Sequence, residues 1–384
     1  MSMIGQHNES ADMRLMEKIW HISWLMVLLI CLVAMIGFAM LFSAANGSLD
    51  PWAERQMIRF GIGLGLLIVV ALIDLRFWMR NAYLIYGLAL VLLVSVEVLG
   101  TIGMGAQRWI DVGFFQFQPS ELMKVALVLA LARYFHGLNH EEVTGFRVLL
   151  LPLLMILIPA ALVLRQPDLG TAVLLVIGGG SVFFLAGARL WLFGLLFVGG
   201  LGALPVAWQF LRDYQKQRVL VFLNPESDPL GGGYHIMQSK IALGSGGLFG
   251  KGFLQGSQSH LNFLPEKQTD FIFTMLAEEF GIAGGLGLLT LYLAIIILGF
   301  VIALRSRNQF GRLVALGLTT TFFLYVFINI AMVMGLIPVV GVPLPLVSYG
   351  GTAMLSLMFS FGIIMSVCVH RDMKIGRRWV SHAD

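Results

Sequence analysis

Long apolar segments alternate with short polar ones along the whole chain. Ten of them approach the roughly 20 residues that a helix needs to cross the hydrocarbon core of a bilayer. They lie at residues 22–44, 57–74, 82–102, 119–136, 147–164, 169–187, 190–211, 271–303, 313–336 and 350–369. This pattern predicts an all-α, polytopic membrane protein of about ten transmembrane helices, because a helix satisfies its own backbone polar groups in lipid. Residues 1–384 are expected to form a single integral membrane domain.

Two of the connections between these segments are longer than a turn. The first covers residues 103–118, and the second covers 212–270, between the seventh and eighth segments. The second mixes glycine and serine with apolar residues at helical spacing, such as Tyr234, Met237 and Ile241. That mixture favours a re-entrant or surface-lying helix over a disordered linker.

Charged residues are scarce and unevenly placed. The chain is 58% hydrophobic and 12% charged, with a formal net charge of +4 and a mean hydropathy of +0.86. With ten spans and a cytoplasmic N-terminus, most lysines and arginines fall on the inner side, as the positive-inside rule requires. Both termini are therefore predicted to be cytoplasmic, and 212–270 is predicted to be one large extracytoplasmic loop. The net positive charge is accounted for by this orientation in the membrane, so it does not indicate a nucleic-acid partner.

Three superficial motifs carry no function in this interpretation. The two cysteines lie in apolar segments and suggest neither a disulfide scaffold nor a zinc site. The glycine-rich stretch before Lys251 departs from the phosphate-loop pattern at two positions and follows no predicted strand. His136 and His140 are four residues apart, but Gly137 between them indicates a helix end and a solvated loop rather than a metal site.

Polar residues with possible chemistry gather where apolar segments begin. Pro119 breaks the preceding loop, Ser120 can cap a new helix, and Glu121 suits the first turn of a helix dipole. Lys124 does not suit that position, but at three residues from Glu121 it shares a helix face with it and can pair with it. Either Lys124 snorkels to the outer interface, or the two residues line a polar cavity.

Arg59, Arg108 and Asp168 are further candidates. The two arginines lie on the predicted outer side, against the orientation rule, and a guanidinium group is well shaped to bind phosphate oxygens. Each arginine is equally compatible with a plain interfacial anchor. Asp168 lies in a very short turn and is predicted to cap the following helix; its access to a polar cavity is left open.

Asp270 stands at the junction of the long polar loop and the eighth apolar segment. Together with Thr269 it could cap a helix that starts at Phe271. A carboxylate at a helix N-terminus is also held in place and kept ionised, as a general base requires. Glu278 and Glu279 lie two to three turns deeper, so at least one is expected to face a protein or water-filled interior.

Five motifs together are similar to the SEDS family (shape, elongation, division, sporulation), in that family's order and over nearly the whole chain. They are 105–109 (GAQRW), 118–121 (QPSE), 166–171 (QPDLGT), 265–273 (PEKQTDFIF) and 343–351 (PLPLVSYGG). The run 338–346 (PVVGVPLPL) and the short tails resemble the elongation branch, RodA, more than the division branch, FtsW. Gln268 departs from the pattern, since many relatives carry histidine beside the key acid.

The resemblance implies a peptidoglycan glycosyltransferase of the bacterial inner membrane that polymerises lipid II into β-1,4 glycan strands during cell elongation. It also implies partners: lipid II and the nascent strand, a class B penicillin-binding protein that cross-links the strands, and other elongation-complex proteins. The family's essential acid corresponds to Asp270, and its cavity residues correspond to Glu121 and Lys124. Arg59 and Arg108 are expected beside them, and Asp168 is included as a candidate substrate-binding residue.

The residues suit that chemistry. The sugar of lipid II is α-linked to a lipid diphosphate and the polymer linkage is β, so one inverting displacement with a single base is sufficient. Asp270 is the expected base, and Lys124, Arg108 or Arg59 is expected to stabilise the departing diphosphate. The sequence shows no metal-ligand cluster, so a divalent cation such as Mg²⁺ or Mn²⁺ would be held by substrate and by Asp270.

Two other functions stay open at this point. A lipid II flippase would need charged residues through the depth of the membrane, and apart from Glu97, Glu278 and Glu279 few are found there, which favours the enzyme. A non-catalytic scaffold of the wall-synthesis complex would leave Asp270 dispensable.

Overall fold

A computed structural model describes residues 14–376, except for 104–105, 112, 114–115, 139, 144, 211–212, 225, 227, 229–231 and 261–265. The helices are α1 Leu15–Trp20, α2 Trp24–Ala44, α3 Ala53–Leu72, α4 Leu75–Leu99, α5 Pro119–His136, α6 His140–Val143, α7 Phe146–Arg165, α8 Leu169–Leu185, α9 Leu190–Phe210, α10 Asp213–Leu223, α11 Gly232–Ser245, α12 Ser257–His260, α13 Ile272–Arg305, α14 Gln309–Val333 and α15 Gly351–Val369. Each of the ten apolar segments predicted from the sequence overlaps one of the long helices.

Seven helices of the described part of the chain are long and apolar enough to cross a membrane: α2, α3, α4, α7, α13, α14 and α15. The apolar helix α8 is 17 residues long, and α5 contains Glu121, Lys124 and Arg133. The protein is thus a helical, multi-span membrane protein. That all ten long helices cross the bilayer stays a prediction.

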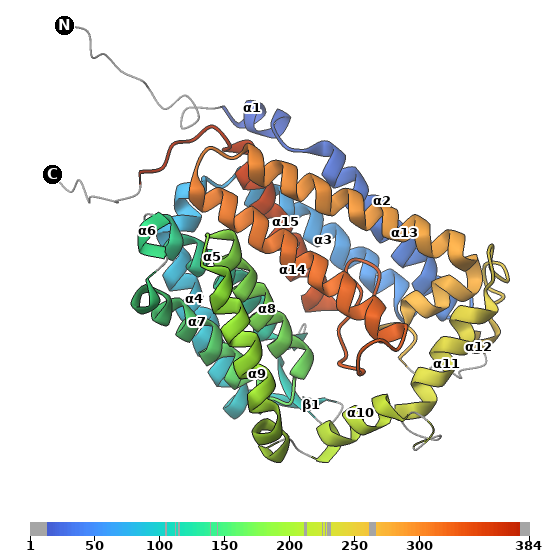
Figure 1. Ribbon diagram of the computed structural model, residues 1–384. Helices are drawn as coiled ribbons and strands as arrows, with labels where there is room; N and C mark the ends of the chain where they lie inside the picture. Colours follow the sequence, from blue (N-terminus) through green and yellow to red (C-terminus); the bar gives the residue numbers. More distant parts are fainter. Residues whose placement is uncertain are drawn as a thin grey trace, which may run out of the picture.

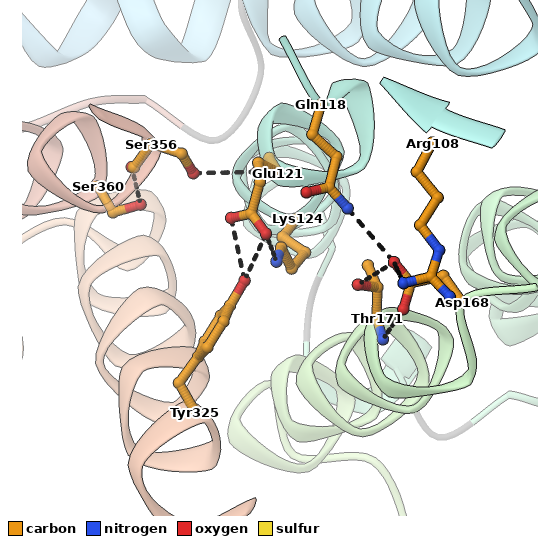
Figure 2. A network of polar contacts seen from close by, with 9 residues as sticks. All are labelled: Arg108, Gln118, Glu121, Lys124, Asp168, Thr171, Tyr325, Ser356 and Ser360. Carbon is orange, nitrogen blue, oxygen red and sulfur yellow. Dashed lines mark hydrogen bonds and ion pairs between the residues drawn. The ribbon is translucent and has the colours of Figure 1, made fainter. Parts of the chain in front are cut away.

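The first long connection contains strands, which the expectation of an all-α chain did not include. The strands β1 Thr101–Gly103, β2 Ala106–Asp111 and β3 Gln116–Phe117 form an antiparallel sheet in the order β1-β2-β3. The strands are too short for their periodicity to be recognised in the sequence. The sheet positions Arg108, on β2, next to the start of α5 and α8 (Figure 2).

Helix α5 is the centre of the bundle. It packs against α4, α7, α8, α14 and α15, and 15 of its 18 residues are buried. Helix α3 packs on α15, and α13 lies between α14 and α2 (Figure 1). A helix surrounded by other helices has no lipid-facing side, so polar side chains on α5 face protein rather than hydrocarbon.

The second long connection is largely helical. In Figure 1, α10, α11 and α12 form an arm that leads from α9 to the start of α13. The predicted helical residues Tyr234, Met237 and Ile241 all lie on α11, which packs against α13. The Ser239 hydroxyl of α11 donates to the Val333 carbonyl, at 2.8 Å. The extracytoplasmic location of this loop stays a prediction.

Helix α13 is broken at Gly281, where φ is 67° and ψ is −163°. The segment 246–252 satisfies the backbone groups that the break frees. Its amides at Lys251 and Gly252 donate to the Glu278 and Glu279 carbonyls, each at 3.0 Å. Its carbonyls at 247 and 248 accept from the amides of residues 282 and 283, each at 3.0 Å. Irregular backbone is tolerated here because it is paired with protein.

Between α14 and α15 the chain runs without a helix through the interior of the bundle. Leu344, Leu346 and Val347 of this segment are buried. The segment packs so closely on α2 that a Cβ at Gly37 would lie 2.7 Å from the Val347 Cα atom, so only glycine fits there. The Tyr292 hydroxyl of α13 donates to the Pro345 carbonyl, at 2.6 Å. We call residues 341–351 the interior segment, because it contacts both parts of the site described next.

Candidate active site

Glu121 and Lys124 form a buried ion pair one helical turn inside α5. The Lys124 ammonium lies 2.7 Å from Glu121 Oε1, and the two side chains are 5% and 8% exposed. The Tyr325 hydroxyl of α14 lies 3.1 and 3.0 Å from the two carboxylate oxygens (Figure 2). The Tyr325 ring lies under the ammonium group, whose nitrogen is 4.3 Å from the ring centroid. Lys124 is therefore not a snorkelling lysine.

The local structure of α5 explains the position of Glu121 but not that of Lys124. Pro119 occupies the first helical position, and Gln118 precedes it as the N-cap residue. The N-cap makes no side-chain cap hydrogen bond, so the expectation that Ser120 caps this helix is wrong. Glu121 lies in the first turn, where the helix dipole stabilises a carboxylate. Lys124 is stabilised by its partners instead, because an unpaired buried ammonium group would lose its hydration without compensation.

A second group of charges adjoins the first. Asp168 caps α8, as predicted, since its carboxylate accepts from the Thr171 amide at 3.1 Å and from the Thr171 hydroxyl at 2.9 Å. Arg108 Nη1 lies 3.8 Å from Asp168 Oδ2. The Gln118 amide donates to the same oxygen at 3.3 Å, which links this pair to the start of α5 (Figure 2). Arg108 also donates to the carbonyls of Gln166 and Pro167.

A small cavity borders the Glu121–Lys124 pair. It is lined by this pair, by Tyr325 and Ser356, and by residues 343–346 of the interior segment. Its volume is about 40 Å³, enough for a few waters but not for a sugar. The pair thus borders a cavity, but most of the residues that line it are apolar, and a large substrate would enter it only if its walls moved apart.

Asp270 lies on a turn, residues 266–270, that the interior segment holds in place. The Ser348 hydroxyl donates to the Thr269 carbonyl at 2.6 Å, and the Tyr349 amide donates to the Gln268 carbonyl at 2.8 Å. The Asp270 side chain is half-buried. Residues 261–265, including Pro265 of the sequence motif, lie outside the described residues.

Asp270 does not occupy the N-cap position of helix α13. The helix begins at Ile272, and its N-cap residue is Phe271, without a side-chain cap hydrogen bond. Instead, the Asn329 amide group of α14 donates to the Asp270 backbone carbonyl at 3.0 Å and to the Val342 carbonyl at 2.7 Å. Asn329 therefore ties the Asp270 turn to both α14 and the interior segment.

The side chains around Asp270 define its surroundings further. The Gln268 amide group donates to Glu266 Oε2 at 3.2 Å, so this residue, found where many relatives are expected to have histidine, is bonded within its own turn. Lys267 is buried, and burial lowers the pKa of its ammonium group.

Arg59 contacts the interior segment. Its guanidinium carbon lies 4.9 Å from the centroid of the Tyr349 ring, and a Cβ at Gly351 would lie 3.2 Å from it. The Asp270 carboxylate lies at another point of this segment, 3.4 Å from the position of a Cβ at Gly341. The predicted site residues thus form one group around the start of α5, namely Glu121, Lys124, Arg108 and Asp168, while Arg59 and Asp270 each lie beside the interior segment.

Glu278 and Glu279 are both fully buried in protein, as expected for at least one of them. Glu278 Oε1 pairs with the Lys251 ammonium group at 2.7 Å and accepts from the Gln258 amide at 2.9 Å. Glu279 Oε1 accepts from the Ser43 hydroxyl at 2.5 Å. Lys251, at the end of the apparent phosphate loop, is therefore the counter-ion of Glu278 and anchors segment 246–252 at the break in α13.

The sequence did not single out Tyr325, Asn329 or the amide group of Gln118. Tyr325 is 204 residues from Glu121, and no local spacing connects the two. Gln118 belongs to the QPSE motif of residues 118–121, and this motif was the sequence signal that could have identified it. In the part of the chain that the structure describes, no group of three or more His, Cys, Asp and Glu residues could hold a metal ion. The described residues therefore do not by themselves provide a cluster of ligands for a cation.

These features define a class: a helical, multi-span membrane protein that encloses paired charges in its interior beside a small, mostly apolar cavity. The sequence of residues 21–373 matches the model of the FtsW, RodA and SpoVE family, described as cell cycle proteins. The chain belongs to this family, which includes the elongation branch predicted from its motifs.

Relatives and solved structures agree with this assignment. The chain is 48% identical to the peptidoglycan glycosyltransferase MrdB of Escherichia coli, over 90% of this chain and 94% of the relative. It is 37% identical to the stage V sporulation protein E of Bacillus subtilis, over 89% of this chain and 96% of the relative.

Two structures show the same fold. The crystal structure of the rod shape-determining protein RodA of Thermus thermophilus is 31% identical, with a TM-score of 0.69 over 92% of this chain and 98% of the other. A chain from a peptidoglycan synthase complex that coordinates polymerisation and crosslinking is 33% identical, with a TM-score of 0.79 over 91% of this chain and 98% of the other.

Proposed function

We propose that this protein is a peptidoglycan glycosyltransferase of the bacterial inner membrane that polymerises lipid II during cell elongation. One observation carries the proposal: the buried Glu121–Lys124 pair borders a cavity lined by residues 343–346 of the interior segment, and the same segment holds the turn that carries the half-buried acid Asp270. Relatives in Escherichia coli and Helicobacter pylori that carry this enzyme name are 48% and 37% identical to the chain. Their names support the activity, and the RodA-like fold supports the role in elongation.

The proposed reaction is one inverting displacement. The 4-oxygen of the acceptor sugar attacks the anomeric carbon of the donor, the bond from that carbon to the diphosphate oxygen breaks, and the diphosphate leaves with the bonding electrons. Asp270 takes the proton of the acceptor hydroxyl as general base. One carboxylate is sufficient because inversion needs no covalent sugar–enzyme intermediate.

Positive charge is needed where the diphosphate departs. Lys124 is the strongest candidate, since its buried ammonium group would interact with phosphate in a low-dielectric environment. Arg108 would have to exchange one of its contacts with Gln166, Pro167 and Asp168 for phosphate, and Arg59 can act from its position beside Tyr349. Asp168 would position Arg108 rather than contact substrate. Because the cavity is small, binding of lipid II requires its walls to separate.

The contacts of the deep acids favour the enzyme over a flippase. Glu278 is paired with Lys251, and Glu97 lies 3.6 Å from Arg165. Glu278 and Glu97 are thus each paired with a neighbouring cation, and the two acids do not form a chain of charges through the bilayer. We also propose that a class B penicillin-binding protein is the crosslinking partner, because one structure with this fold comes from a synthase complex.

The test is Asp270→Asn, assayed as lipid II polymerisation by purified protein with its penicillin-binding partner. Asparagine keeps the shape of the side chain but cannot accept the proton. We expect a folded protein that still binds its partner and loses on the order of 100-fold or more in polymerisation rate.

The matched control is Glu266→Gln, which neutralises another carboxylate of the same turn and retains an oxygen that can accept from Thr269 and Gln268. It should polymerise at close to the parent rate. A folded Asp270→Asn protein with near-parent polymerisation would exclude Asp270 as the base and would leave Glu121, Glu278 or Glu279 as the next acids to test.

A further inference from the structure

Asn329 is a fully buried residue of α14 whose side chain reaches two separate stretches of backbone. Its amide group donates to the Asp270 carbonyl at 3.0 Å and to the Val342 carbonyl at 2.7 Å. The first carbonyl belongs to the turn that carries the proposed base, and the second belongs to the interior segment. One side chain therefore fixes the position of each stretch relative to the other.

The two carbonyls set the orientation of the Asn329 amide. A flipped amide would direct its oxygen at two carbonyl oxygens, and all three atoms are acceptors, so only the nitrogen can face them. Among the described residues, the side-chain oxygen of Asn329 has no hydrogen-bond partner. A buried acceptor without a partner lowers stability. Asparagine thus contributes here through its two donated hydrogen bonds, at the expense of its oxygen.

The Asp270 carboxylate lies against the stretch of chain that Asn329 contacts. Its Oδ2 atom is 3.4 Å from the position of a Cβ at Gly341, the residue that precedes Val342. Gly341 has a φ of 72°, in the left-handed region that favours glycine. The hydrogen bonds of Asn329 are therefore made at Asp270 itself and next to Gly341, on both sides of this contact. A shift of either carbonyl would move the carboxylate relative to the interior segment.

Helix α14 gives Asn329 a firm support, because 18 of the 25 residues of this helix are buried. Tyr325 lies four residues before Asn329, so the two side chains share a helix face. The Tyr325 hydroxyl donates to the Glu121 carboxylate. The same face of α14 therefore contacts both the buried ion pair and the turn of the proposed base.

We propose that Asn329 is a positioning residue for Asp270: its two hydrogen bonds fix the Asp270 backbone, and hence the carboxylate, relative to the interior segment. This inference rests on the glycosyltransferase function proposed above. A general base must lie within hydrogen-bond reach of the hydroxyl that it deprotonates, and a displacement of about 1 Å can cost about 100-fold in rate. Asn329 acts through Asp270 and not on the sugar or the diphosphate, so its loss should lower kcat and leave KM for lipid II unchanged.

The experiment measures kcat and KM for lipid II polymerisation by the purified full-length protein with its penicillin-binding partner. The variants are Asn329→Leu, Asp270→Asn and the two combined. Leucine has a similar size and removes both donors, so we expect kcat to fall about 10- to 100-fold, with KM within about twofold of the parent. In the Asp270→Asn background the same substitution should cost less than about twofold more, because no base remains to be positioned. Long incubations give the rates of the slow variants.

The matched control is Thr319→Val, which replaces another buried polar side chain of α14 with one of nearly the same shape. Thr319 is about three helical turns from Asn329, and its hydroxyl has no partner among the described residues. This variant should polymerise lipid II like the parent. Asn329→Ser keeps one short donor and covers the case in which Asn329→Leu does not fold. It should show the same loss of kcat, again without further loss when combined with Asp270→Asn.

The results separate this inference from the function on which it rests. Near-parent polymerisation by Asp270→Asn would remove the proposed base, and with it any residue that positions the base. If Asp270→Asn is slow, three results would overturn the role of Asn329 alone: a parent-like rate in Asn329→Leu, a raised KM with unchanged kcat, or a full further loss in the combined variant. An equal loss in Thr319→Val would indicate a general disturbance of α14. Failure of both Asn329 variants to fold would assign this residue a structural role only.

Discussion

Lys124 shows how one buried side chain can have both a structural and a chemical role. Its ammonium group satisfies Glu121, and Tyr325 contacts both partners. Removing one member of a buried pair leaves the other charge uncompensated and costs about 3–5 kcal/mol of stability. Replacing both members with neutral side chains of similar volume is often close to neutral. A single substitution at Lys124 therefore confuses the two roles, and a paired substitution separates them.

We predict that Lys124→Met lowers the thermal midpoint of unfolding markedly, while Glu121→Gln/Lys124→Met recovers most of that loss. If Lys124 stabilises the departing diphosphate, the double variant should still polymerise lipid II at least about 100-fold more slowly than the parent. The measurements are thermal unfolding in detergent and the polymerisation rate of the same preparations. Recovery of both stability and turnover in the double variant would assign Lys124 a purely structural role.

At the scale of the element, the break in α13 depends on one glycine. Gly281 has a backbone conformation that other residues adopt only with strain. A Cβ there would also lie 2.4 Å from the Gly250 amide nitrogen and 2.6 Å from the Leu248 carbonyl oxygen. The break and segment 246–252 therefore support each other, with Lys251 and Glu278 as the side-chain contact between them.

We predict that Gly281→Ala destabilises the protein by about 2–4 kcal/mol, because the added methyl group combines backbone strain with a steric clash. Thermal unfolding in detergent is the measurement. The control is Gly287→Ala on the same helix, where the added carbon has no neighbour within 4 Å. It should leave stability unchanged or raise it by up to about 1 kcal/mol. Equal stability of the two variants would mean that segment 246–252 does not depend on the break.

For the whole molecule, function depends on which end of α5 faces the cytoplasm. Arg133 in the last turn of α5 and Arg305 in the last turn of α13 suit the inner side. The Asp270 turn and α10 to α12 then lie outside, where lipid II would be polymerised. This orientation rests on charge distribution and stays a prediction.

Cysteine labelling tests the orientation. The two native cysteines are first replaced by alanine, and Gln255→Cys or Lys374→Cys is then introduced, both at exposed positions. A membrane-impermeant maleimide should label the variant at 255, and not the variant at 374, in cells with a permeabilised outer membrane. The opposite labelling pattern would contradict both the orientation and the proposed mechanism.

The chain by itself determined the helical membrane fold, because lipid allows few backbone solutions and apolar length indicates them directly. It also determined that Glu121 and Lys124 share a helix face and that Asp168 caps a helix, since both depend on spacing of three residues. Its motifs indicated the family that the comparison with known proteins then established.

Only the tertiary structure decided which distant residues meet. It brought Tyr325 to Glu121, tied the Asp270 turn to Asn329, and paired Lys251 with Glu278. It also showed that Phe271, and not Asp270, is the N-cap residue of α13. These contacts depend on which helices are neighbours and how deeply the interior segment enters the bundle. Such packing is set by the shapes of many side chains together, so no local pattern in the sequence records it.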